Sequence, residues 1–139
     1  MKKDWSPELL SVLRIIVAFL FIQHGTAKWF AFPAAVMPGG GVAAVASLAW
    51  FAAVIETIGG ALMLVGVFAR PVAFILAGEM AFAYFLGHVR NGFWPSLNGG
   101  EAAVFFCFTF LYLSAAGPGP WSLDALRARR RSASTVPVG

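Results

Sequence analysis

The sequence predicts an all-α membrane protein, an up-down-up-down bundle of four transmembrane helices. Of its 139 residues, 60% are hydrophobic and only 12% are charged, and the mean hydropathy is +0.80. Four long apolar stretches account for this composition, at residues 9–32, 42–68, 71–87 and 102–116. A helix needs about 20 apolar residues to cross a hydrocarbon core about 30 Å thick. We therefore expect each stretch to span a membrane and residues 1–126 to form a single transmembrane domain.

The first two stretches are separated by residues that break helices. The first stretch follows a short segment of mixed charge and has no small-residue cleavage site, so we expect a permanent helix and not a signal peptide. Pro33, Pro38 and Gly39–Gly41 then interrupt the chain before the second stretch.

Short connections also separate the later stretches. Residues 69–71 are expected to form a tight turn, because Pro71 suits the first position of a helix. Asn91–Gly92 and Pro95 break the chain after the third stretch, and residues 117–120 end the fourth. Connections this short make consecutive helices antiparallel neighbours. The basic tail, residues 127–139, is expected to be disordered.

The distribution of basic residues predicts the orientation in the membrane. With four spans, only Lys28 and Arg90 fall on one side of the membrane. The other side receives Lys2, Lys3, Arg14, Arg70, Arg127, Arg129, Arg130 and Arg131. Cytoplasmic loops of membrane proteins are rich in Lys and Arg, so both termini should be cytoplasmic in a bacterial inner membrane. Topology also explains the net charge of +4, and no nucleic-acid partner is expected.

Polar residues within the apolar stretches mark the candidate site. Glu56 and Glu79 lie near the centres of the second and third stretches, where a charge costs several kcal/mol. His24 and Lys28 are four residues apart and share a face in the outer half of the first helix. Four further polar residues are expected at the outer mouth, namely His88, Arg90, Asn98 and Glu101. Together they predict a polar pocket that opens outward, whereas Arg14 should extend to the opposite interface.

Two interpretations of these residues remain open. In a structural one, His24 or Lys28 bonds to Glu56, while a protonated Glu79 bonds to a backbone carbonyl or to a tyrosine such as Tyr84. In the other, Glu56, His24 and Glu79 are catalytic candidates, because a carboxyl and an imidazole can relay protons to a bound small molecule. Quinones are natural ligands for such a site, since they dissolve in lipid and take up two protons on reduction.

Other cofactors are not indicated. The chain contains no Glu-x-x-His or His-x-x-x-His pair, which would be typical of a metal site in a helical bundle. Its one cysteine, Cys107, excludes an internal dithiol. No covalent or motif-supported cofactor is therefore expected, and a bound quinone is the remaining candidate.

Several short motifs resemble those of the DoxX family of small bacterial membrane proteins. They occur in the family's order at residues 24–28, 56–60 with Gly66 and Arg70, 92–94, 98–101 and 117–124. Ala31 departs from the pattern, because many members have a glycine soon after the lysine and aromatic pair. The resemblance implies a four-helix inner-membrane protein, related to the membrane subunits of a thiosulfate:quinone oxidoreductase, with some members linked to thiol redox and oxidative-stress defence.

Three functions follow as alternatives. The first is a redox-associated subunit that interacts with the quinone pool or with thiol and sulfur redox partners, and that is not expected to be catalytic alone. Its substrate or quinone would contact His24, Lys28, Glu56, His88, Arg90, Asn98 and Glu101. The second is a non-enzymatic membrane anchor or scaffold for a soluble redox enzyme. The third is a small-solute transporter, which four spans would favour only as a homo-oligomer.

Overall fold

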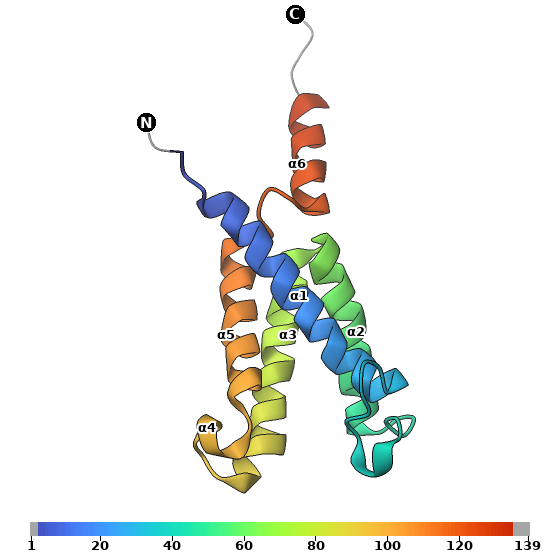
Figure 1. Ribbon diagram of the computed structural model, residues 1–139. Helices are drawn as coiled ribbons and strands as arrows, with labels where there is room; N and C mark the ends of the chain where they lie inside the picture. The colour runs from blue at the N-terminus through green and yellow to red at the C-terminus, as the bar shows by residue number, and fades with distance from the viewer. Residues whose placement is uncertain (1–2, 135–139) are drawn as a thin grey trace, which may run out of the picture.

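The computed structural model describes residues 3–134, which contain helices and no strands. The long helices are α1 (Ser6–Phe30), α2 (Leu48–Val65), α3 (Ala69–Ala83) and α5 (Glu101–Ala116). Figure 1 shows the chain running alternately down and up through them, with α1 slanting across the other three. The shorter elements are η1 (Pro38–Gly40), η2 (Tyr84–His88), η3 (Val89–Asn91), α4 (Pro95–Asn98) and α6 (Leu123–Ser134).

Three helical segments are long and apolar enough to cross a membrane. They are α1, α2 and the continuous segment Ala69–Asn91, which joins α3 to η2 and η3. The apolar helix α5 is shorter, with 16 residues. The all-helical membrane class is thus confirmed. The second predicted stretch was too long, because α2 begins only at Leu48, where the Ser47 hydroxyl caps the helix by accepting a hydrogen bond from the Trp50 N–H at 3.2 Å.

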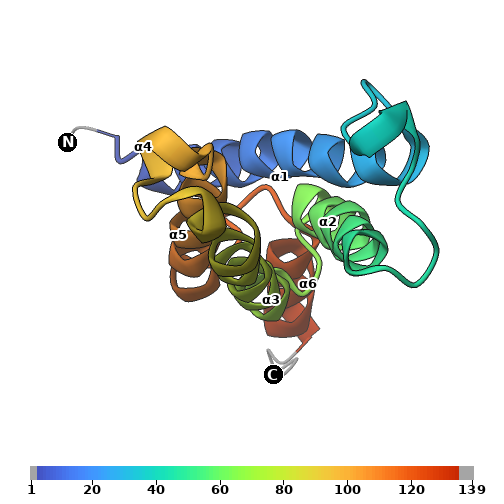
Figure 2. The same ribbon diagram turned by 90° about the horizontal axis from the view of Figure 1, so that it is seen from below.

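The long helices pack as two pairs. Helix α1 contacts mainly α2, and α3 contacts mainly α5, while the contact between α2 and α3 is smaller. Figure 2 shows α3 beside α5 and α2 apart from them, with α1 running across the view from the α5 side to α2. Buried side chains from all four helices join the pairs in one core, including Phe21, Met63, Leu76 and Phe110. Many large apolar side chains point outward instead, as expected of a surface that faces lipid: Phe19, Phe51, Phe74, Phe82, Phe105 and Phe108.

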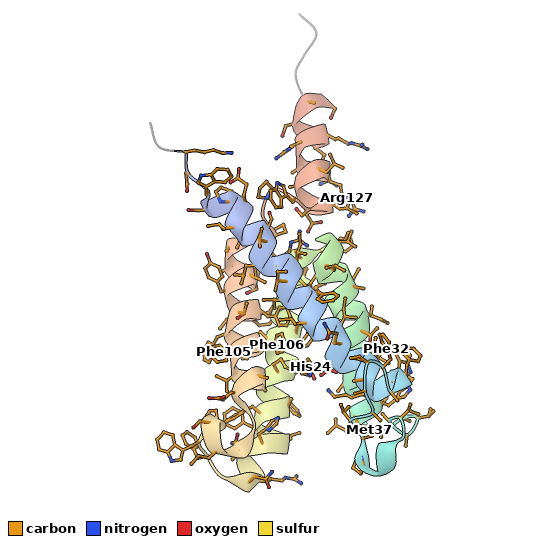
Figure 3. All side chains as sticks on the ribbon, in the orientation of Figure 1. His24, Phe32, Met37, Phe105, Phe106 and Arg127 are labelled. Atoms are coloured by element: carbon orange, nitrogen blue, oxygen red, sulfur yellow. The ribbon has the colours of Figure 1, made fainter. Side chains whose placement is uncertain are left out.

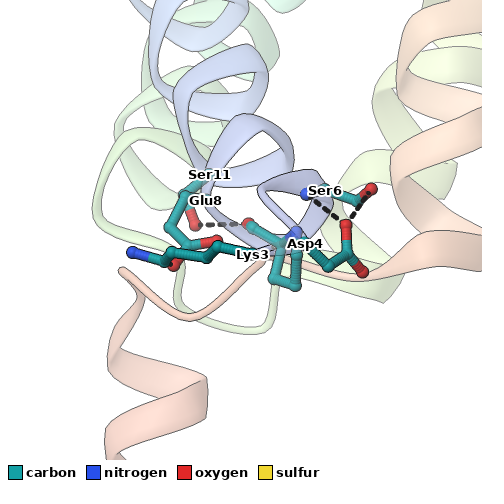
Figure 4. Close-up of polar contacts among 6 residues, drawn as sticks. Lys3, Asp4, Ser6, Glu8 and Ser11 are labelled. Carbon is teal, nitrogen blue, oxygen red and sulfur yellow. Dashed lines mark hydrogen bonds and ion pairs between the residues drawn. The ribbon is translucent and has the colours of Figure 1, made fainter. Parts of the chain in front are cut away.

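The start of α1 is fixed by local polar contacts (Figure 4). The Asp4 carboxylate accepts hydrogen bonds from the Ser6 N–H at 2.9 Å and from the Ser6 hydroxyl at 2.7 Å. These bonds favour the charged form, so they hold the pKa of Asp4 below its usual value. Lys3 and Glu8 form an ion pair at 3.8 Å beside them.

Arg14 is fully buried in the first half of α1. Its guanidinium donates to the carbonyls of Pro118 at 2.8 Å, Leu64 at 2.7 Å and Trp121 at 2.5 Å, and also to that of Met63. The prediction that Arg14 extends to the interface was therefore wrong. The carbonyls at the end of α2 accept few bonds from their own helix, and that of Met63 accepts one from the capping Gly66 N–H at 3.1 Å. The loop before α6 adds two more carbonyls, so the guanidinium is satisfied inside the protein.

Two more charged residues bind helix ends near Arg14. Arg70 donates to the carbonyls of Ser114 at 3.2 Å and Ala116 at 3.4 Å, and also to that of Ala115, which satisfies the C-terminal turn of α5. The Asp124 carboxylate accepts from the N–H groups of Phe68 at 3.1 Å and Ala69 at 2.9 Å, at the N-terminus of α3. Each charge has the sign that the helix dipole favours. Arg14, Arg70 and Asp124 are called the polar clasp below.

The basic tail differs from the prediction. Residues 127–134 are helical, as the second part of α6, and not disordered. The helix forms because the Ser122 hydroxyl accepts a hydrogen bond from the Ala125 N–H at 3.1 Å and so caps its first turn. The rest of the predicted tail, residues 135–139, lies outside the described residues.

Replacing Arg14 should show that the clasp stabilises the fold. We expect Arg14→Leu to lower the free energy of unfolding by about 3 kcal/mol or more, since it leaves several carbonyls without donors. The measurement is reversible SDS unfolding of the protein in mixed micelles. Arg90→Leu, at an exposed position, should change the value by less than about 0.5 kcal/mol. Equal effects of the two changes would contradict a structural role for Arg14.

Candidate functional site

The site begins with the close approach of α1 and α2 at Gly25. A Cβ atom at Gly25 would lie 2.4 Å from the Thr57 hydroxyl oxygen, 2.7 Å from the Thr57 backbone nitrogen and 2.9 Å from the Ala53 carbonyl oxygen. Two of these atoms belong to the backbone of α2 and cannot move aside. Only glycine therefore allows the two helices to pack this closely.

The same close packing continues along α2. A Cβ atom at Gly60 would lie 2.6 Å from Ile22 of α1, and one at Gly59 would lie 2.6 Å from Leu76 of α3. The two adjacent glycines thus allow α1 to pack closely on one side of α2 and α3 on the other. Glu56 precedes them by one turn, so its carboxyl group lies among three helices.

Lys28 and Glu56 form a buried ion pair between α1 and α2. The Lys28 ammonium donates to Glu56 Oε1, and the exposed fractions of the two side chains are 25% and 1%. Lys28 follows Gly25 by three residues, so it lies on the same face of α1 one turn further along. Of the two partners predicted for Glu56, the structure brings Lys28 to the carboxylate. His24 makes no hydrogen bond with Glu56 within residues 3–134.

Glu79 approaches the same region from α3. It lines one cavity together with Lys28. Within residues 3–134, neither Glu79 Oε2 nor Glu56 Oε2 has a hydrogen-bond partner, although both atoms are buried. The predicted bond from Glu79 to Tyr84 does not form, because the Tyr84 hydroxyl donates to the Phe93 carbonyl. Two carboxyl oxygens are therefore available to a ligand, a proton or water.

A cavity of about 550 Å³ lies between α2 and α3, at the place where the two helix pairs meet. Apolar side chains form most of its wall, among them Ala52, Ile55, Ile75 and Phe82. Lys28 and Glu79 are its charged residues. The sequence predicted a polar pocket, whereas this cavity is apolar with two charged groups. We call it the α2–α3 cavity.

A second cavity, of about 500 Å³, lies on the other side of Lys28. It is lined by Gln23, His24 and Lys28 of α1, by the loop that includes Met37, and by Phe106 of α5. Figure 3 shows His24 between Phe106 and Met37, and its ring meets that of Phe106 edge to face at 5.4 Å. Lys28 lines both cavities, so the Lys28–Glu56 pair stands between them.

The four residues predicted at the outer mouth do not join this site. The His88 ring bonds to the Asn98 carbonyl at 3.2 Å, and the Asn98 amide donates to the Gly92 carbonyl at 2.7 Å and accepts from the Gly100 N–H at 2.8 Å. These contacts brace the connection between α3 and α5. Arg90 and Glu101 are exposed. None of the four lines either of the two cavities.

Across residues 3–134, no three His, Cys, Asp or Glu side chains come together in a way that could hold a metal ion. Sequence reasoning missed Gly78, which gives the α2–α3 cavity part of its width and has nothing within 4 Å of its Cβ position. The sequence feature that could have identified Gly78 is its place as a small residue directly before the intramembrane Glu79.

Comparison with known proteins agrees with the resemblance to the DoxX family that the sequence motifs indicate. The DoxX family model matches residues 9–89. The chain belongs to the DoxX family. An uncharacterised protein of Haemophilus influenzae is 46% identical over 125 residues, which are 88% of this chain and 92% of that protein. An uncharacterised membrane protein of Mycobacterium tuberculosis is 28% identical over 141 residues, covering 91% and 86% of the two chains. No solved structure matches this DoxX-family chain.

Adding a methyl group at Gly25 should separate α1 from α2. We expect Gly25→Ala to lower the free energy of unfolding by about 1–3 kcal/mol, because the added atom would overlap the backbone of α2. The matched control is Gly78→Ala, a glycine in another apolar helix that has open space at its Cβ position. SDS unfolding of both variants measures the difference. A stable Gly25→Ala protein would contradict the close approach.

Breaking the Lys28–Glu56 pair from one side should cost more than removing both partners. We expect Lys28→Met to destabilise the protein by about 3–5 kcal/mol, since it leaves Glu56 buried without a counter-charge. The double variant Lys28→Met/Glu56→Gln should recover part of this loss. A double-mutant cycle on unfolding free energies tests the coupling. Additive effects would show that the two side chains do not interact.

Proposed function

We propose that the protein crosses a bacterial inner membrane four times, with α5 as the fourth span and both termini cytoplasmic. Figure 1 supports this, because the start of α1, the helix α6 and the turn between α2 and α3 lie at one end of the molecule. Helix α5 has 16 residues and rises about 24 Å, so the bilayer would thin slightly around it. Lys3, Arg70 and the arginines of α6 fall on the cytoplasmic side, as the positive-inside rule requires.

We propose further that this protein is a redox-associated subunit that binds a quinone in the α2–α3 cavity. The observation that carries the proposal is an apolar cavity of about 550 Å³ whose charged residues are Lys28 and Glu79. Ligand cavities commonly measure about 300–1,000 Å³, with mostly apolar walls and few polar groups. A quinone has this chemistry, since its ring and tail are apolar and its two carbonyls accept hydrogen bonds.

The residues around the cavity suit the two carbonyl groups. The Lys28 ammonium can donate to one of them, and a protonated Glu79 can donate to the other. Glu56 holds Lys28 in position, and its second carboxyl oxygen is buried without a partner in the described chain. A bound quinone would accept two electrons and two protons. Glu79 and Glu56 are placed to hold those protons, whereas the electrons must come from a redox partner, because the chain has a single cysteine and no dithiol.

Quinone binding by purified protein in lipid nanodiscs tests the proposal. Native mass spectrometry with a short-chain ubiquinone should detect one molecule per chain. We expect Gly78→Phe, which fills the cavity, to abolish binding, and Glu79→Gln to weaken it by about tenfold, or about 1.4 kcal/mol. Ala102→Phe and Glu101→Gln are the matched controls at exposed positions of α5, and both should bind like the unchanged protein.

Two results would overturn the proposal. One is equal binding by Gly78→Phe and Ala102→Phe, which would place any quinone elsewhere. The other is a quinone-free particle, gently extracted from its own membrane, that co-purifies with a soluble enzyme. That second result would favour the anchor function over the redox one.

A further inference from the structure

Helix α6 is held rigidly where it leaves the helical bundle. The Asp124 N–H donates to the Gly66 carbonyl at 3.0 Å, and the Asp124 carboxylate binds the first turn of α3. Arg14 holds the Trp121 carbonyl at 2.5 Å, and the Trp121 N–H donates to the Ser11 hydroxyl at 3.1 Å. A Cβ atom at Gly66 would lie 2.4 Å from that of Ser122, so the helix base sits directly on the end of α2.

Beyond this base, α6 has no core of its own. Residues 126–134 are all exposed, and Figure 1 shows the helix projecting away from the other helices. A helix of 12 residues is marginally stable in water by itself. Arg127 lies over the Phe68 ring at 5.9 Å, whereas residues 128–130 are exposed. The surroundings of α6 must therefore supply the rest of the stability of this helix.

The position of α6 identifies those surroundings. Arg127, Arg129 and Arg130 follow Asp124 by three to six residues, which places them within about 10 Å of the bundle end. The headgroup layer on each side of a bilayer is about 5–7 Å thick, and charges act over a Debye length of about 8 Å beyond it. Trp121 and Phe68 are exposed at the base of the helix, as residues at a membrane interface are.

We propose that α6 binds anionic phospholipids through its arginines, in the leaflet on the side of the chain termini. Successive residues of a helix point about 100° apart, so Arg127, Arg130 and Arg131 share one face of α6, and Arg129 lies on the opposite side. A helix that passes through the headgroup layer meets phosphates on every side. A groove on an acidic protein would bind the shared face alone and would leave Arg129 outside the contact. The proposal goes beyond the quinone function and does not depend on it.

Hydrogen exchange of the whole protein in nanodiscs tests this proposal. One set of discs contains phosphatidylcholine alone, and the other contains added phosphatidylglycerol. We expect the amides of α6 to exchange more slowly with the anionic lipid, and this protection to fall in high salt. The double variant Arg129→Gln/Arg130→Gln should reduce the protection ratio by about 25-fold, or about fivefold per arginine. The matched control, Arg90→Gln at the opposite end of the bundle, should leave the ratio unchanged.

Three outcomes would overturn the proposal. Equal exchange of α6 in both kinds of disc would show that anionic lipid does not bind it. An equal loss of protection in Arg90→Gln would show a general charge effect and not a site on α6. Protection that rises with protein concentration and not with phosphatidylglycerol would assign the surface to a second copy of the chain.

Discussion

The buried ion pair between Lys28 and Glu56 is the interaction on which the rest of the site depends. A carboxylate near the centre of a membrane is costly without a counter-charge, and Lys28 supplies one from the neighbouring helix. That contact requires α1 to lie against the backbone of α2, which Gly25 allows. Because Lys28 lines both cavities, the pair also sets the boundary between an apolar cavity beside Glu79 and a second one beside His24.

Other charged residues of the bundle bind the ends of helices and do not line the candidate site. Arg14 and Arg70 satisfy carbonyls that end α2 and α5, and Asp124 satisfies N–H groups that begin α3. The clasp gathers these ends near the chain termini and leaves the opposite halves of the two helix pairs joined by fewer polar contacts. It also fixes the base of α6, whose exposed arginines extend the charged end of the molecule.

Sequence reasoning identified the helices well because their signal is local. Apolar length gave α1, α2 and the segment from α3 to η3, and intramembrane charge pointed to Glu56, Glu79 and Lys28. It failed where the answer depends on three-dimensional neighbours. Nothing local shows that Arg14 meets carbonyls from a loop more than a hundred residues away, or that the His88 ring bonds to the Asn98 carbonyl. Ser122 and Asp124 are typical residues for the start of a helix, but the basic composition of residues 127–134 did not show that this helix continues to Ser134.

The most direct test of this account is a solid-state NMR measurement of Lys28 in lipid bilayers. With Lys2 and Lys3 replaced by arginine, Lys28 is the one lysine left in the chain, so the side-chain amine signal reports that residue alone. The account predicts a strong dipolar coupling between the Lys28 amine nitrogen and one glutamate carboxyl carbon, and its loss in Glu56→Gln. No coupling, or a coupling that survives Glu56→Gln, would show that the pair does not exist in the membrane and that the site described around it is wrong.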